Sequence, residues 1–142
     1  MNTTVQPQDL DVFTCPLDRR QLIEASAGTG KTWTICALYL RLLFERDLSV
    51  QQILVVTYTN AAAAELRERI RSRLVELVAK LRQGRSAGNG DALTDGVLAA
   101  ADAVLDRPRA LRVFETALQT FDEAAIFTIH GFCQRALADT PF

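Results

Sequence analysis

The hydrophobic positions of this chain follow two periodicities, and the alternation between them predicts an α/β protein. Residues 53–57 form a continuous, β-branched apolar run, which is typical of a parallel strand covered on both faces. Residues 21–24 and 124–128 are also predicted as strands, the first of them short and buried. Longer stretches with apolar residues three and four positions apart are predicted as helices over 32–46, 60–82, about 93–105, 108–121 and 132–138.

The order of these elements predicts a parallel sheet flanked by helices. Residues 21–24, 32–46 and 53–57 would form a βαβ unit, right-handed by default. The helix over 32–46 is apolar almost all round, so we expect it to be buried against the sheet. Asn60 is the predicted N-cap of the following helix. Residues 1–16 are expected to be an N-terminal segment, and the glycine-rich residues 83–92 a flexible loop.

A glycine-rich turn lies directly between the first predicted strand and the first predicted helix. Residues 23–32 read I-E-A-S-A-G-T-G-K-T, which follows the phosphate-loop template except that Ala25 replaces its first glycine. In such a loop the backbone N–H groups and the helix N-terminus surround an anion. Lys31 would reach the β- and γ-phosphates of ATP, and the Thr32 hydroxyl would bind Mg²⁺, so we predict catalytic roles for both. The predicted cofactor-binding residues are Ala25, Ser26, Ala27, Gly28, Thr29, Gly30, Lys31 and Thr32. A chance glycine-rich turn is the structural alternative.

Composition narrows the function classes. A chain of 142 residues with 49% apolar content fits one domain with an ample core. Its longest apolar run is too short to span a membrane, and the polar N-terminus does not resemble a signal peptide. Three cysteines without C-x-x-C spacing argue against a disulfide framework or a zinc site, which favours a reducing cytoplasm, and Cys133 is expected in the core.

Net charge gives no global attraction to nucleic acid, because the chain carries a formal charge of −1. Residues 65–85 do carry seven positive and three negative side chains, a local charge of +4. The arginines at every second position from Arg67 to Arg73 fan around a helix and do not form one stripe. We therefore favour a solvated face with i,i+4 pairs such as Glu65–Arg69, with a direct DNA contact as the alternative.

Three ordered blocks of this sequence resemble motifs of superfamily 1 helicases of the UvrD/Rep type. They are L-I-E-A-S-A-G-T-G-K-T at 22–32, I-L-V-V-T-Y-T-N-A-A-A-A-E-L-R-E-R-I at 53–70 and I-F-T-I-H-G-F-C-Q-R at 126–135. They are similar to motifs I, Ia and Ib/Ic, and the wording of the first and third is closest to RecB-type subunits of exodeoxyribonuclease V. The resemblance implies a RecA-like P-loop NTPase domain, of which residues 1–142 would be the N-terminal part, in helicase domain 1A. Alanine at position 25 is usual in that family.

The resemblance also implies a DNA-binding surface. In these helicases motif Ia lies against single-stranded DNA, so Tyr58 would stack on a base while Thr59 and Asn60 contact a phosphate. Thr128 and His130 would contact the same strand. Both blocks follow predicted strands, and open α/β sheets bind ligands at the carboxyl ends of their strands. Alternatively, Tyr58 packs against a neighbouring helix and His130 is a structural hydrogen-bonding residue.

By resemblance, the parent protein would be an ATP-dependent helicase–nuclease that acts on DNA ends in double-strand break repair and recombination. It would translocate 3′ to 5′ on single-stranded DNA with partners RecC and RecD, and a separate nuclease domain would use Mg²⁺. The present chain is expected to be truncated, because its one candidate for the Mg²⁺-positioning acid, at 121–123, precedes a strand and does not end one. The alternatives are a nucleotide-binding module without turnover, an AddA-type helicase–nuclease and, least favoured, a small P-loop kinase.

Overall fold

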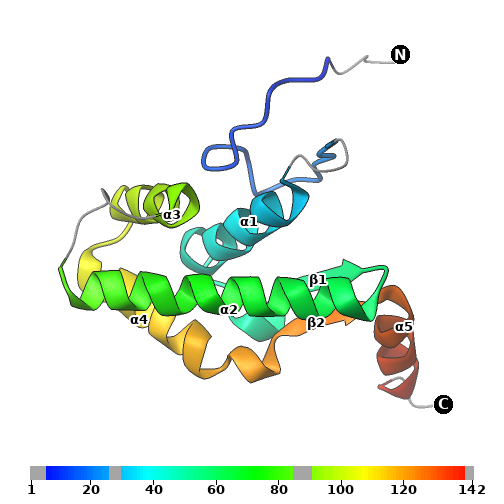
Figure 1. Ribbon diagram of the computed structural model, residues 1–142. Coiled ribbons are helices and arrows are strands. Elements are labelled where there is room, and N and C mark those ends of the chain that lie inside the picture. The colour runs from blue at the N-terminus through cyan, green and yellow to red at the C-terminus, as the bar shows by residue number, and fades with distance from the viewer. Residues whose placement is uncertain (1–5, 26–29, 85–90, 140–142) are drawn as a thin grey trace.

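The computed structural model describes residues 6–25, 30–84 and 91–139 (Figure 1). The described residues form helices and two short strands, whereas the hydrophobic periodicity predicts three strands. In chain order the elements are α1 Lys31–Glu45, η1 Val50–Gln52, β1 Leu54–Thr57, α2 Asn60–Arg82, α3 Ala92–Asp102, α4 Arg107–Gln119, η2 Phe121–Glu123, β2 Ala125–Thr128 and α5 Ile129–Ala138.

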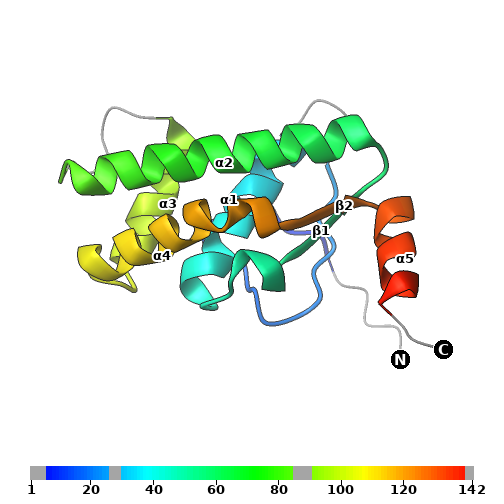
Figure 2. The same cartoon turned by 90° about the horizontal axis from the view of Figure 1, so that it is seen from below.

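The two strands run parallel and pair directly, with Leu54 opposite Ala125 and Thr57 opposite Thr128. The chain crosses from one strand to the other through α2, α3 and α4. Helix α2 runs alongside both strands, and α5 contacts both of them at their far end (Figures 1 and 2). The predicted parallel arrangement of residues 53–57 and 124–128 is therefore confirmed.

The hydrophobic core lies mainly among α1, α2, α3 and α4. Leu40, Ile70, Leu74 and Phe114 are fully buried there. Helix α1 packs against the other three helices, so the prediction that a sheet would cover it is wrong. The strands have four residues each and are covered by α2, and the other helices therefore offer α1 the larger apolar surface.

Residues 21–24 do not form the predicted buried strand. Their side chains are exposed, with Leu22 at 86% and Ile23 at 37% relative accessibility. A strand needs ladder hydrogen bonds to a neighbour, and within the described residues β1 and β2 pair only with each other. A four-residue apolar run alone does not show whether such a neighbour exists.

The N-terminal segment is attached to α1 and α3 by a turn at residues 11–15. Val12 is buried, and the Phe13 ring meets the Trp33 ring edge-on with 5.8 Å between centroids. Buried Arg41 donates from Nη1 to the Val12 carbonyl at 2.7 Å and from Nε to Glu45 at 2.6 Å. The only sequence signal for this attachment was a charged residue inside an otherwise apolar helix.

Helix α2 ends at Arg82 and α3 begins at Ala92, so the predicted loop over 83–92 extends one residue into α3. Residues 85–90 lie outside the described part. Among the helices of the described residues, none is long and apolar enough to cross a membrane.

Candidate functional site

The predicted phosphate loop ends in a left-handed glycine at the start of α1. Gly30 has φ 80° and ψ 31°, a conformation that favours glycine, and its carbonyl accepts the Thr34 N–H at 2.9 Å. Lys31 is exposed and Thr32 is half-buried in the first helical turn. That turn contains no acidic residue. An anion at this helix end would therefore meet free N–H groups and one lysine ammonium, with no carboxylate on that turn.

These residues fit a triphosphate as far as the structure describes them. Ala25 is half-buried just before the loop, whereas the predicted ligands Ser26, Ala27, Gly28 and Thr29 lie outside the described residues. Lys31 would hold the phosphates and Thr32 the Mg²⁺ ion, which when bound neutralises the charge that develops on the phosphates.

The end of β1 turns directly into α2 through three exposed or half-exposed polar residues. The Thr57 hydroxyl donates to the Thr59 carbonyl at 3.2 Å. The Thr59 hydroxyl accepts the Ala62 N–H at 3.1 Å, so Thr59 is the N-cap of α2 and Asn60 is its first residue. This corrects the predicted cap by one position, because a threonine with extended backbone meets the cap geometry first. Tyr58 is 90% exposed, which contradicts the alternative of a packed ring.

The end of β2 repeats this arrangement. The Thr128 hydroxyl accepts the Gly131 N–H at 3.0 Å and caps α5. His130 is exposed in the first turn of that helix, which begins three residues earlier than predicted. Cys133 is exposed, so its expected place in the core is wrong. Helix α5 contributes no buried residue because one side of it alone meets the strands.

The sheet register brings the two junctions together. Thr57 and Thr128 are partners in the ladder, so the threonine-capped starts of α2 and α5 follow neighbouring strand ends. Figure 2 shows the strands side by side, with α5 beyond their ends. Neither helix has an acidic residue in its first turn. We call residues 57–60 and 128–131 the strand-end edge. It combines one exposed tyrosine ring with hydroxyl, imidazole and helix-terminal N–H donors.

The arginines of α2 point in different directions, as their spacing predicts. Arg69 pairs with Glu65 at 2.8 Å, which confirms the predicted i,i+4 pair. Arg73 pairs with Glu76 and Asp91 at 3.1 and 2.5 Å. Arg67 instead donates from Nη2 to the backbone carbonyl of Ile126 in β2 at 2.6 Å. No local pattern predicts this contact, because its partners are 59 residues apart.

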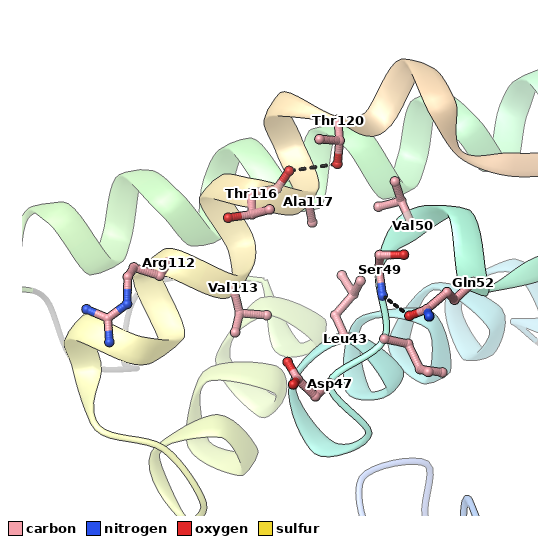
Figure 3. Close-up of a pocket in the computed structure, with 11 residues that line it drawn as sticks. Leu43, Asp47, Ser49, Val50, Gln52, Arg112, Val113, Thr116, Ala117 and Thr120 are labelled. Carbon is pink, nitrogen blue, oxygen red and sulfur yellow. Dashed lines mark hydrogen bonds between the residues drawn. The ribbon is translucent and has the colours of Figure 1, made fainter.

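Two cavities in the described residues lie away from the strand-end edge. A cavity of about 290 Å³ opens between η1 and α4, lined by apolar Leu43, Val50 and Val113 together with Asp47 and Arg112 (Figure 3). A second, of about 240 Å³, lies between α1, α2 and α3 beside Trp33. Burial raises the pKa of the Cys36 thiol on its wall. No residue predicted to bind ATP or DNA lines either cavity.

A parallel β1–β2 pair with helical crossovers, a glycine-to-helix turn ending in Gly-Lys-Thr and a polar strand-end edge define an α/β domain of the helicase type. Residues 5–141 match the model of the UvrD/REP helicase N-terminal domain, and the chain belongs to that family, which has the RecA-like fold.

Curated relatives agree with this family. The chain is 49% identical over 139 residues to the RecBCD enzyme subunit RecB of Escherichia coli K12, covering 92% of this chain and 11% of that protein. It is 44% identical over 141 residues to the RecB subunit of Haemophilus influenzae, covering 94% and 12%. The RecB subunit of Mycobacterium tuberculosis is 40% identical over 116 residues, which is 82% of this chain and 10% of that protein. The chain thus spans about a tenth of the length of these relatives, and the predicted resemblance to RecB-type subunits is confirmed.

Proposed function

We propose that this chain is the part of an ATP-dependent, RecB-type DNA helicase–nuclease subunit that binds ATP and contacts single-stranded DNA. The single observation that carries the proposal is the pairing of Thr57 with Thr128, because it places both predicted DNA-contact segments at one edge. ATP would bind at the start of α1, with its phosphates at Lys31 and its Mg²⁺ ion at Thr32. Assembly with RecC and RecD is supported by the name of the relatives, RecBCD enzyme subunit RecB, and we propose a role in repair and recombination from the same resemblance.

On the strand-end edge, each residue would have its own part. The Tyr58 ring would stack on a base, because it is exposed and has two accessible faces. Asn60 and the N–H groups at the starts of α2 and α5 would bind phosphates. The hydroxyls of Thr59 and Thr128 accept one hydrogen bond each within their caps, which leaves their protons for donation to DNA. His130 would add an imidazole donor beside Thr128.

Nucleotide binding is tested by titrating a fluorescent ATP analogue with Mg²⁺ into the chain and into its Lys31→Ala variant. We expect saturable binding that Lys31→Ala abolishes. Arg46→Ala is the matched control, since it removes one exposed cation from the opposite end of α1. A folded circular-dichroism spectrum without nucleotide binding by the unmodified chain would refute the proposed site.

DNA contact is tested by fluorescence anisotropy with a labelled oligothymidylate. Tyr58→Ala is expected to weaken binding by about 1–3 kcal/mol, the usual contribution of one base stacked on an aromatic ring. Tyr58→Phe keeps the ring and should bind like the unmodified chain. If both variants bind equally well, the ring does not stack on DNA.

A second function, nucleotide binding without turnover, is favoured for the isolated chain by one observation. A P-loop ATPase needs an acidic residue at the end of a strand to position Mg²⁺. In the described residues β1 ends at Thr57 and β2 at Thr128, and the acidic pair Asp122 and Glu123 precedes β2. We expect the isolated chain to release no phosphate from ATP above background, with or without single-stranded DNA, even when the analogue binds.

A further inference from the structure

Arg67 links α2 to β2, the helix and the strand whose ends contribute to the strand-end edge. Its guanidinium on α2 donates to the Ile126 carbonyl on β2 at 2.6 Å. The Ile126 N–H donates to the Ala124 carbonyl at 3.1 Å, so both backbone polar groups of Ile126 have partners outside the pairing with β1. The Ile126 side chain is only 1% exposed. A charged donor on a buried carbonyl is a short, strong hydrogen bond, and it fixes β2 against α2.

Arg67 differs in its chemistry from three other arginines of its helix. Arg69, Arg73 and Arg82 each pair with a carboxylate. Across residues 6–25, 30–84 and 91–139, no carboxylate lies within ion-pair distance of Arg67, which is half-buried. The hydrogen bond of Arg67 to a main-chain carbonyl therefore fixes the position of α2 against β2 and is not an ion pair.

The position of this bond relates it to the predicted DNA contacts. Arg67 lies about two helical turns after Asn60, and Ile126 lies two residues before Thr128. The Arg67 charge also opposes the rise that burial causes in the pKa of Tyr39 on α1. A change in the Arg67–Ile126 distance would therefore move the start of α2 relative to the end of β2.

We propose that Arg67 is a positioning residue for single-stranded DNA. It holds the starts of α2 and α5 at the separation at which donors from both junctions reach one DNA strand. In this proposal Arg67 itself does not contact the DNA, and its role is the hydrogen bond from Nη2 to the Ile126 carbonyl within the fold. This inference rests on the proposed DNA-binding function of the strand-end edge.

The test is the affinity of the chain for a labelled oligothymidylate, measured over a series of salt concentrations. Arg67→Met is expected to weaken binding about 5- to 10-fold at every concentration. The slope of log K against log salt should stay unchanged, since no phosphate contact is lost. Arg67→Lys should lie between Arg67→Met and the unmodified chain, because an ammonium can still donate one bond. Arg71 is an exposed arginine on the same helix, so Arg71→Met is the charge-matched control and should weaken binding less than Arg67→Met.

Three results would overturn the proposal. A slope reduced by about one in Arg67→Met would make Arg67 a direct phosphate ligand. Equal losses in Arg67→Met and Arg71→Met would make the effect one of charge alone, and unchanged affinity would remove any role. Binding of the ATP analogue shows that each variant is folded. If Arg67→Met does not fold, the affinity and salt slope of Arg67→Lys test the proposal by the same criteria. An unmodified chain that binds the ATP analogue but no DNA at low salt refutes the DNA surface itself, and with it this inference.

Discussion

The helices α1 to α4 bury many of their apolar side chains, whereas the strands and the strand-end edge expose several of theirs. Among the helices, Leu40, Leu74 and Phe114 have no exposed surface. At the start of β1, Leu54 is 49% exposed; on the strand-end edge, Tyr58 is 90% and Ile129 44% exposed, and α5 buries none of its residues. The helices therefore supply most of the core, to which Val50, Phe121 and Ile126 add, whereas the strand ends present side chains and N–H groups to the outside. In this molecule the part that supplies stability and the part proposed to bind DNA are separate.

The sharpest test of this separation compares truncations of similar chemistry in the two regions. Phe114→Ala should lower the free energy of unfolding by about 3–5 kcal/mol, because it removes a fully buried ring. Leu54→Ala should cost less than about 1 kcal/mol, because half of that side chain is already in water. Urea unfolding followed by circular dichroism measures both. Comparable losses would show that the strand face belongs to the core.

The contact between the N-terminal segment and α3 is expected to have the next largest effect. A Cβ atom at Gly96 would lie 2.2 Å from Cζ of Phe13, so Gly96→Ala forces that ring to move. We expect it to lower the free energy of unfolding by about 1–3 kcal/mol. In a Phe13→Ala background the clash is gone, and the same substitution should stabilise the helix by up to about 1 kcal/mol. A destabilising effect in both backgrounds would show that the ring is not the cause.

At the strand-end edge, stability should depend on the two threonine caps. Thr59→Val and Thr128→Val are each expected to lower the free energy of unfolding by about 1 kcal/mol, because Ala62 and Gly131 lose the acceptors of their N–H groups. Thr128→Ser keeps the hydroxyl and serves as the control. Thermal unfolding measures the difference, and serine and valine variants of equal stability would argue against the cap.

Sequence patterns predicted most of the fold because most of it is local. The helix that begins at Lys31 and the one over 60–82 are set by apolar residues three and four positions apart, and their bounds agree with the structure to within one residue. The strand at 53–57 was visible from its β-branched run. Residues 21–24 failed because a strand depends on a neighbour, which a short apolar run does not reveal.

The candidate site was predicted less completely, for a related reason. The resemblance to helicase motifs identified Lys31, Tyr58 and Thr128 from the sequence. The structure brings Tyr58 and Thr128 to one edge. The contact of Arg67 with Ile126 depends on how α2 lies along β2, and the seating of Phe13 on Trp33 depends on how the N-terminal segment returns to α1. Neither arrangement leaves a trace in local periodicity.

The smallest expected effect on stability concerns Tyr39, a buried tyrosine on α1. Tyr39 is 1% exposed, and its ring meets that of Phe121 edge-on at 6.4 Å, but its hydroxyl has no hydrogen-bond partner in the described part of the chain. A buried hydroxyl without a partner costs stability. Tyr39→Phe should therefore raise the free energy of unfolding at pH 7, by about 0.5 kcal/mol. Tyr58→Phe, which removes a hydroxyl from an exposed ring, is the matched control and should leave it unchanged.

The same pair of variants gives a pH dependence with a definite sign. Burial raises the pKa of Tyr39 to about 12 in the folded chain, against an ordinary value of 10.0. Above pH 10 the unfolded chain loses this proton before the folded chain does, so the stability of the unmodified protein falls as the pH rises towards 12. Tyr39→Phe lacks that loss, and its advantage over the unmodified chain should widen over this range in urea unfolding. An advantage that stays constant from pH 9 to pH 12 would mean that solvent reaches the hydroxyl, and the packing around Tyr39 and Phe121 would then be more open than the structure indicates.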